Sequence, residues 1–102
     1  MILFWTTPAI DDLKAIQDYI AQGSEYYASE FIQRILQTVQ KLSEFPELGR
    51  PIPEIQDPAA RELIFQNYRI LYRLRHDRID LAAVIHGRRD LKRKMAERWE
   101  VL

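Results

Sequence analysis

Glu62, Arg69, Arg73 and His86 are the side chains of this sequence whose types together could act on a phosphodiester. A carboxylate or an imidazole can move protons, and guanidinium groups can hold a phosphate and balance the charge that develops in the transition state. Arginines that alternate with acidic residues are also the ordinary way for an antiparallel sheet to keep one face hydrated. Both interpretations stay open until the strands that carry these residues are placed.

Three strands are expected in the second half of the chain, at residues 61–65, 68–75 and 79–86, because these runs are rich in β-forming residues. With Gln66-Asn67 as a two-residue turn, Glu62 lies opposite Leu71. With Asp77-Arg78 as the second turn, apolar residues pair on one face: Leu74 with Leu81, Tyr72 with Ala83, and Ile70 with Ile85.

The same register has a consequence for the other face of the sheet. It places Arg69 opposite His86, and it brings Glu62 and Arg73 to the same side. We therefore expect these four side chains to share the face that helices leave uncovered.

The first half of the chain predicts the elements that cover the opposite face. A strand is expected from Ile2 to Thr6, followed by a helix that begins at Thr7-Pro8, with Thr7 as its cap, and stops at Gly23. A second helix begins after Ser24 and ends before Pro46. Apolar residues recur on one face of each helix: Ala9, Leu13, Ile16 and Ile20 on the first, and Ala28, Phe31, Ile32, Ile35, Leu36, Val39 and Leu42 on the second.

Residues 46–60 contain four of the five prolines and predict an extended connector between the helices and the last three strands. The resulting order is β-α-α-β-β-β. The fold class is therefore expected to be α+β, an antiparallel sheet with a two-helix hairpin packed on one face.

Length and composition limit the classes of function. With 102 residues and 47% hydrophobic residues, the chain is expected to form one domain, residues 1–102. The sequence has no cysteine, and two histidines cannot alone build a catalytic zinc site, so neither a metal nor a cofactor is expected. No run approaches the ~20 apolar residues that span a bilayer, and the start lacks a secretory signal. A cytoplasmic protein with no membrane partner is therefore expected.

The charge is zero overall but unevenly distributed. Residues 1–60 carry four basic and nine acidic residues, a net charge of −5, whereas residues 61–102 carry eleven basic and six acidic residues, a net charge of +5. A basic half indicates an anionic partner, such as nucleic acid or an acidic protein segment, unless it is only a solvated face. Arg88 and Arg89 follow Gly87 in a constrained loop, and with Arg73 they are candidates for binding a phosphate or a target.

Four segments, taken together and in this order, resemble the RelE/ParE superfamily of toxins from bacterial type II toxin–antitoxin modules. They are residues 5–13 (WTTPAIDDL), residues 45–51 (FPELGRP), residues 61–63 with 68–73 (REL and YRILYR), and residues 86–91 (HGRRDL). The resemblance implies a toxin that inhibits growth, that needs no cofactor, and that a cognate antitoxin wraps and neutralises in a hetero-oligomer.

The superfamily has two activities. ParE-like members poison DNA gyrase and have no hydrolytic site, whereas RelE-like members are metal-independent endoribonucleases that cut mRNA on the ribosome. Ala60 and Glu62 stand where RelE-like enzymes carry basic residues, and Met95 lies near the place of their tail tyrosine. These departures favour the ParE-like branch.

The alternative is the RelE-like branch, because Arg69 and Arg89 match two arginines that RelE-like nucleases use. If the protein is a nuclease, the catalytic set is Arg69, His86 and Glu62.

Overall fold

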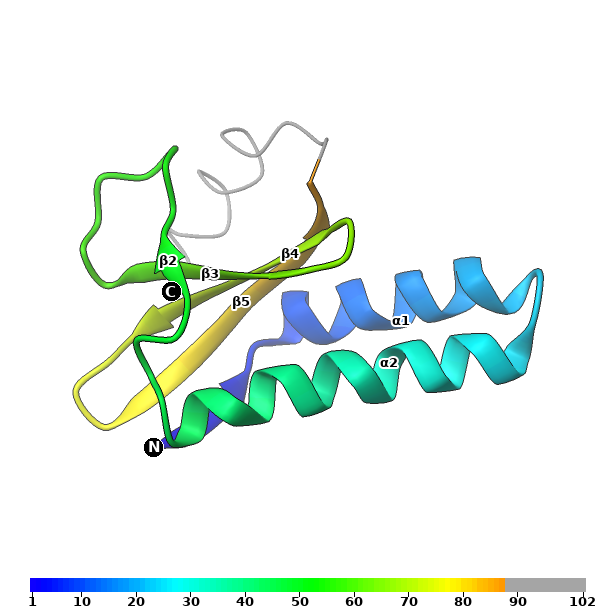
Figure 1. Ribbon diagram of the computed structural model, residues 1–102, viewed down its shortest axis with the longest axis horizontal. Helices are drawn as coiled ribbons and strands as arrows, with labels where there is room; N and C mark the ends of the chain where they lie inside the picture. Colours follow the sequence, from blue (N-terminus) through cyan, green and yellow to red (C-terminus); the bar gives the residue numbers. More distant parts are fainter. Residues whose placement is uncertain (88–102) are drawn as a thin grey trace.

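A computed structural model describes residues 1–87, which form two layers. The helices α1 (Thr7–Ala21) and α2 (Glu25–Gln40) lie side by side along one face of a five-stranded sheet (Figure 1). The other elements are β1 (Ile2–Trp5), a short 3₁₀ helix η1 (Lys41–Ser43), β2 (Arg50–Pro51), β3 (Ala60–Phe65), β4 (Tyr68–Leu74) and β5 (Arg78–His86). The strand order is β1-β5-β4-β3-β2. The predicted α+β fold, with a helical hairpin on one face, is confirmed.

Two features of the sheet differ from the prediction. The strand β1 pairs with β5 in parallel. Parallel neighbours need a long connection, and here the chain passes through both helices and through β2, β3 and β4 between these two strands. In addition, part of the proline-rich connector joins the sheet, since Arg50 and Pro51 pair with Glu62 and Arg61 at the edge of β3. Proline is tolerated at this edge because it has no N–H group to donate to a further strand.

Both helices begin at side-chain caps. The first cap is Thr6 and not the predicted Thr7: Thr6 Oγ1 accepts a hydrogen bond from the N–H of Ala9 (3.3 Å) and donates to the carbonyl of Leu81 (2.7 Å). The same hydroxyl therefore starts α1 and joins it to β5. At the second helix, Ser24 is the cap as predicted, and its Oγ accepts from the N–H of Tyr27 (3.2 Å).

The main core lies between the helices and the sheet. The predicted stripe of α2 supplies much of it, although Leu36 is exposed and is not part of it. Tyr72 is the largest of the side chains that are fully buried. The buried members of this core are Ala9, Ile16, Ile35, Val39, Leu42, Leu63, Ile70, Tyr72, Ile79, Leu81 and Val84.

A smaller apolar cluster lies on the opposite face of the sheet. Ile52 of the connector, 2% exposed, packs there against Leu71, Ala83 and Ile85, with Ala60 beside them. The connector therefore covers part of the face that the sequence predicted to be open. Because Ile52 holds it there, its polar side chains are brought close to those of the sheet.

The register between β3 and β4 is as predicted, with Phe65 opposite Tyr68 and Glu62 opposite Leu71. The register between β4 and β5 was predicted wrongly. The turn is at His76-Asp77, because the N–H of Arg75 donates to the carbonyl of Arg78 (2.8 Å), and Leu74 therefore lies opposite Ile79 instead of Leu81.

A β-bulge adds a second shift in this hairpin: Tyr72 lies opposite Leu81 and Leu71 lies opposite Ala83, so Ala82 of β5 is the extra residue. Beyond it, Arg69 lies opposite Ile85. A shift of one residue moves each following side chain to the other face of the sheet. Ala83 and Ile85 consequently lie on the face away from the helices, contrary to the prediction.

Candidate functional site

Arg69 is the centre of an ion-pair network on the sheet face away from the helices. Its Nη1 and Nη2 donate to Oε2 and Oε1 of Glu54 at 2.7 and 2.9 Å, which is a two-pronged contact. Its Nε donates to Oε2 of Glu62 at 2.6 Å. The other oxygen of Glu62, Oε1, accepts from Nε of Arg50 at 2.7 Å. One arginine of the sheet is thus held by two carboxylates from different segments.

Glu62 is the β3 residue of this network, and its side chain has no exposure to solvent. Both of its oxygens accept from guanidinium groups, so the carboxylate is engaged on both sides. In this structure neither oxygen is exposed to a substrate proton, which a general base must reach. Glu62 acts here as a buried counter-ion for Arg50 and Arg69.

The path of the connector explains how Glu54 reaches the sheet. Tyr72 Oη accepts from the N–H of Gly49 and donates to the carbonyl of Pro46, both at 2.9 Å. A Cβ on Gly49 would lie 2.5 Å from the carbonyl oxygen of Glu62 and 2.6 Å from Tyr72 Oη, so the close approach requires glycine. With Ile52 buried just beyond, Glu54 is placed over Arg69.

The ionisation of these groups follows from the contacts. The hydrogen bonds from Arg69 hold the pKa of the Glu54 carboxyl below its ordinary value, against a smaller opposing effect of burial. The hydrogen bond to Glu54 likewise raises the pKa of Arg69, so that its positive charge is fixed. Burial raises the pKa of the Tyr72 hydroxyl, which remains a neutral donor to Pro46.

His86 does not share a sheet face with Arg69, which corrects the predicted arrangement. It lies opposite Tyr68, with ring centroids 5.6 Å apart, and Tyr68 in turn packs edge-on against Phe31 of α2. Its ring is therefore on the helix side of the sheet. The cause is the β4–β5 register, which at this end of the hairpin differs by one residue from the predicted register.

Arg69 and His86 nevertheless meet at the end of the sheet. Both line a pocket of about 280 Å³ beside the β3–β4 turn, and Arg50 lines the same pocket. The remaining lining residues are Ile64, Gln66, Asn67, Tyr68 and Gly87. An arginine and a histidine thus reach one small hollow from opposite faces of the sheet.

The other predicted phosphate-binding residues do not join this pocket within the described part of the chain. Arg73 lies on the same sheet face as Arg69, and its Nη2 is 3.6 Å from Oδ2 of Asp57 in the connector. Arg88 and Arg89 lie outside the described residues.

Sequence reasoning missed Arg50 and Glu54, the two connector residues of the network. Their partners Glu62 and Arg69 are 12 and 15 residues away along the chain. The pairing of β2 with β3 brings Arg50 to Glu62, and the burial of Ile52 and the Tyr72–Gly49 hydrogen bond help to hold the connector, with Glu54, against the sheet. The signal available in the sequence was general: acidic residues in a proline-rich segment, before arginines on alternate positions of a strand.

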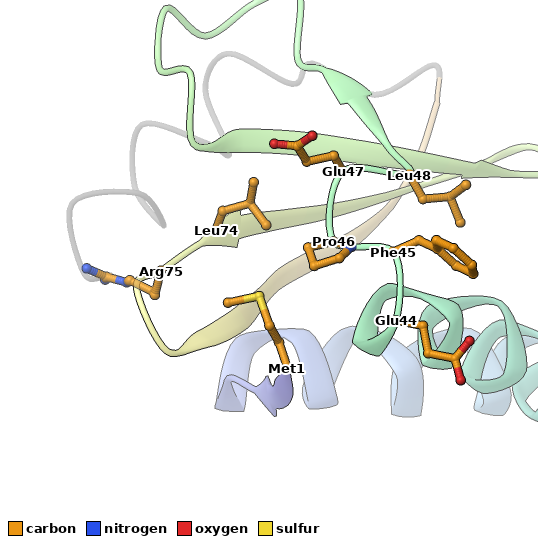
Figure 2. A pocket seen from close by; sticks show the side chains of 8 residues that line it. All are labelled: Met1, Glu44, Phe45, Pro46, Glu47, Leu48, Leu74 and Arg75. Atoms are coloured by element: carbon orange, nitrogen blue, oxygen red, sulfur yellow. The ribbon is translucent and has the colours of Figure 1, made fainter.

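A second and more apolar pocket lies at the other end of the molecule. Figure 2 shows it where the first residue of the chain, the end of β4 and the connector after η1 meet. It has a volume of about 650 Å³, and Phe45 and Leu48 in its wall are 60% and 50% exposed. Met1, Pro46 and Leu74 complete the apolar wall, and Glu44, Glu47 and Arg75 are its charged residues. Its walls are those of a site for an apolar side chain and not for a phosphate.

Two general findings apply to residues 1–87. No three histidine or acidic side chains there lie close enough together to hold a metal ion. Neither helix in this part of the chain is long and apolar enough to cross a bilayer.

Comparison with known proteins places these features in a family. The family model described as "ParE toxin of type II toxin-antitoxin system, parDE" matches residues 3–91. "Toxin RelE2" of Caulobacter vibrioides is 33% identical over 86 residues, which are 83% of this chain and 93% of that protein. "Toxin ParE3" of the same bacterium is 27% identical over 94 residues, which are 91% of this chain and 93% of that protein.

A solved structure agrees in fold. The protein described as "Chromosomal ParDE TA system from P. aeruginosa" is 26% identical, with a TM-score of 0.72, and the match covers 84% of this chain and 95% of that one. The match of the family model over nearly the whole chain and the similarity to two curated toxins lead to one conclusion. This chain belongs to the ParE toxin family of type II toxin–antitoxin systems, and it is a toxin of the RelE/ParE superfamily.

Proposed function

We propose that this toxin inhibits growth by binding DNA gyrase, without cutting nucleic acid itself. The observation that supports this proposal is the state of the predicted catalytic set. Arg69 is held by Glu54 and Glu62, Glu62 is wholly buried, and His86 lies on the other face of the sheet. A toxin that acts by binding does not need these groups to act together on a phosphate.

The partners of Arg69 limit the electrostatic role that this residue could play in catalysis. An arginine that stabilises a transition state must direct donors at the place where negative charge develops. All three nitrogens of the Arg69 guanidinium group already donate to carboxylates. To take the two-pronged contact with Nη1 and Nη2, a scissile phosphate would have to displace Glu54, and the neighbouring negative charge of Glu62 would remain. Both effects weaken the stabilisation that a nuclease requires.

We further propose that a cognate antitoxin neutralises the toxin in a hetero-oligomer in the cytoplasm. The solved relative described as a ParDE toxin–antitoxin system supports such a partner. The excess of positive charge in residues 61–102 indicates that the antitoxin segment carries acidic residues beside apolar anchors. A stable complex of this kind buries at least ~1,000 Å². Co-expression with the adjacent gene, followed by purification at high salt, tests this point, and recovery of the free chain at every salt concentration would argue against it.

The second candidate function is mRNA cleavage on the ribosome. The observation in its favour is that Arg69 and His86 line one pocket, in which Arg50 supplies a further positive charge. In this alternative His86 moves the proton and Arg69 holds the phosphate.

Induced expression of three variants distinguishes the two functions. A gyrase poison produces gyrase-dependent DNA cleavage, and this activity should persist in Arg69→Lys and His86→Gln. A nuclease should instead lose about 10²–10⁴-fold of its mRNA cleavage in His86→Gln, the usual effect of removing a general acid or base. Arg34→Lys is the matched control, because Arg34 forms an exposed pair with Glu30 on α2. Cleavage of mRNA that both site variants abolish, and the control preserves, would refute the gyrase proposal.

A further inference from the structure

We propose that Glu54 is the internal occupant of an anion site: its carboxylate fills the fork of Arg69 that a phosphate group would otherwise take, and residues 53–58 close over the site. This inference does not depend on whether gyrase or mRNA is the target, because the free protein can be tested for it.

The contact itself supports the idea. Arg69 presents Nη1 and Nη2 to the two oxygens of Glu54 at 2.7 and 2.9 Å. A guanidinium group makes this same two-pronged contact with carboxylates and with phosphates, so the two anions compete for one geometry. Oε2 of the buried Glu62 accepts from the third nitrogen, Nε, and lies 2.6 Å from Nη2 as well, and this contact orients the fork towards the connector.

The charges around the fork divide into a fixed set and a set carried by the connector. On this face of the described structure, Arg50 pairs with Glu62, and Arg69 pairs with both Glu54 and Glu62. Arg73 pairs with Asp57. Glu62 belongs to β3 and has no exposure, whereas the side chains of Glu54 and Asp57 are 25% and 22% exposed. The connector therefore supplies the two carboxylates that a shift of residues 53–58 would withdraw, and their withdrawal would leave the face positively charged.

The connector is buried most deeply at the two ends of this segment. Before this segment, Ile52 is buried, and after it, Ala60 is buried in β3. Between them Pro53, Gln56 and Pro58 are exposed, and the N–H of Ile55 donates back to Ile52 at 3.1 Å. Ile55 packs against the same apolar cluster as Ile52, and Asp57 lies 3.6 Å from Arg73. The two-pronged contact of Glu54 with Arg69, at 2.7 and 2.9 Å, is a shorter polar tie between this segment and the sheet.

A phosphate group is the ligand that this geometry fits. Arg69 and Arg50 also line the pocket of about 280 Å³, so a hollow with two positive charges in its wall adjoins the Arg69 side chain. The phosphate can belong to a nucleic acid chain or be free in solution, and a guanidinium fork recognises both.

The test compares Glu54→Gln with Glu47→Gln. Both variants remove one negative charge from the same connector, but Glu47 is exposed and lies in the wall of the apolar pocket, away from the fork. Binding of a fluorescein-labelled oligothymidylate is measured by anisotropy at low ionic strength, where exposed charges are least screened. We expect Glu54→Gln to tighten binding on the order of tenfold, the equivalent of one charge-assisted hydrogen bond. Glu47→Gln should change it less than about twofold.

Two further variants keep the test decisive. The double variant Glu54→Gln/Arg69→Gln should lose the gain, because the fork is gone. Glu54→Asp keeps the charge but shortens the side chain, and it should give part of the gain even if Glu54→Gln folds poorly. Competition with inorganic phosphate identifies the source: reversal of the gain assigns the site to any phosphate group, and no reversal restricts it to the nucleic acid chain. Equal effects of Glu54→Gln and Glu47→Gln, or no effect of Glu54→Gln and Glu54→Asp, would overturn the proposal.

Discussion

Replacement of Glu62 by alanine should be among the most destabilising single changes on the sheet face away from the helices. The Glu62 side chain is wholly buried and accepts from Arg69 at 2.6 Å and from Arg50 at 2.7 Å. Breaking a buried ion pair by removal of one partner costs about 3–5 kcal/mol. The cost should lie near the lower end, about 3 kcal/mol, because Arg69 keeps Glu54 as a partner and Arg50, which is 61% exposed, can be hydrated.

Urea denaturation followed by circular dichroism measures this effect. With a slope of about 1–3 kcal/mol/M, a loss of about 3 kcal/mol lowers the midpoint by at least ~1 M. Glu30→Ala on α2 is the matched control, since Glu30 also pairs with an arginine but at the surface, where such a pair contributes about 0.3–0.5 kcal/mol. The reasoning is refuted if Glu62→Ala lowers the free energy of unfolding by no more than Glu30→Ala does.

Two further perturbations test the contacts of the connector. Because its arginine partner lowers the pKa of Glu54, the stabilising contribution of Glu54 should be full near neutral pH and should be lost as the pH falls below 4.5, the ordinary pKa of this group. The difference in unfolding free energy between wild type and Glu54→Gln, measured by urea titrations, should therefore shrink across this pH range. A difference that is independent of pH would contradict this prediction. Tyr72→Phe removes the acceptor of the Gly49 N–H and the donor to the Pro46 carbonyl, and it should lower the free energy of unfolding, measured by thermal unfolding, by about 1–3 kcal/mol. The control Tyr19→Phe, at a residue that is 72% exposed, should change it by less than about 0.5 kcal/mol.

The sequence predicted those parts of the fold that local chemistry decides. Ser24 caps α2 as expected, and the Gln66-Asn67 turn fixes the β3–β4 register without error. Gln66 has a positive φ of 52°, although tight hairpin turns usually have Asn, Asp or Gly at such a position. The two-residue spacing between the strands therefore predicted the turn better than the residue types did. Caps and short turns depend on few neighbouring residues, which is why they can be read from the sequence.

The β4–β5 hairpin shows where such reasoning stops. Apolar pairing alone favoured the register with Leu74 opposite Leu81, because it placed apolar residues on one face throughout. The sheet instead has apolar clusters on both faces, since Ile52 of the connector covers Leu71 and Ile85. A second buried face makes apolar residues acceptable on either side of β5, so the hydrophobic pattern no longer specifies the register.

The candidate site depends on the same two facts. Glu62 and Arg69 were predicted to share a face through the β3–β4 register, and they are in direct contact. The position of His86 followed from the β4–β5 register and was wrong. The role of Glu54 follows from the connector, whose path no local pattern specifies.

The arrangement of charges connects the fold to the function proposed here. A sheet face with arginines on alternate positions can bind phosphate only where carboxylates do not already hold those arginines. In this chain the connector, fixed by Ile52 and Tyr72, brings Glu54 onto Arg69 and Asp57 to within 3.6 Å of Arg73. Each of these pairings satisfies a buried or half-buried charge and so stabilises the fold, but it also withholds a donor from any substrate. Stability and phosphate chemistry therefore compete for the same guanidinium groups, and this competition is the common basis of the two proposals: a toxin that acts through binding, and a phosphate site that its connector closes.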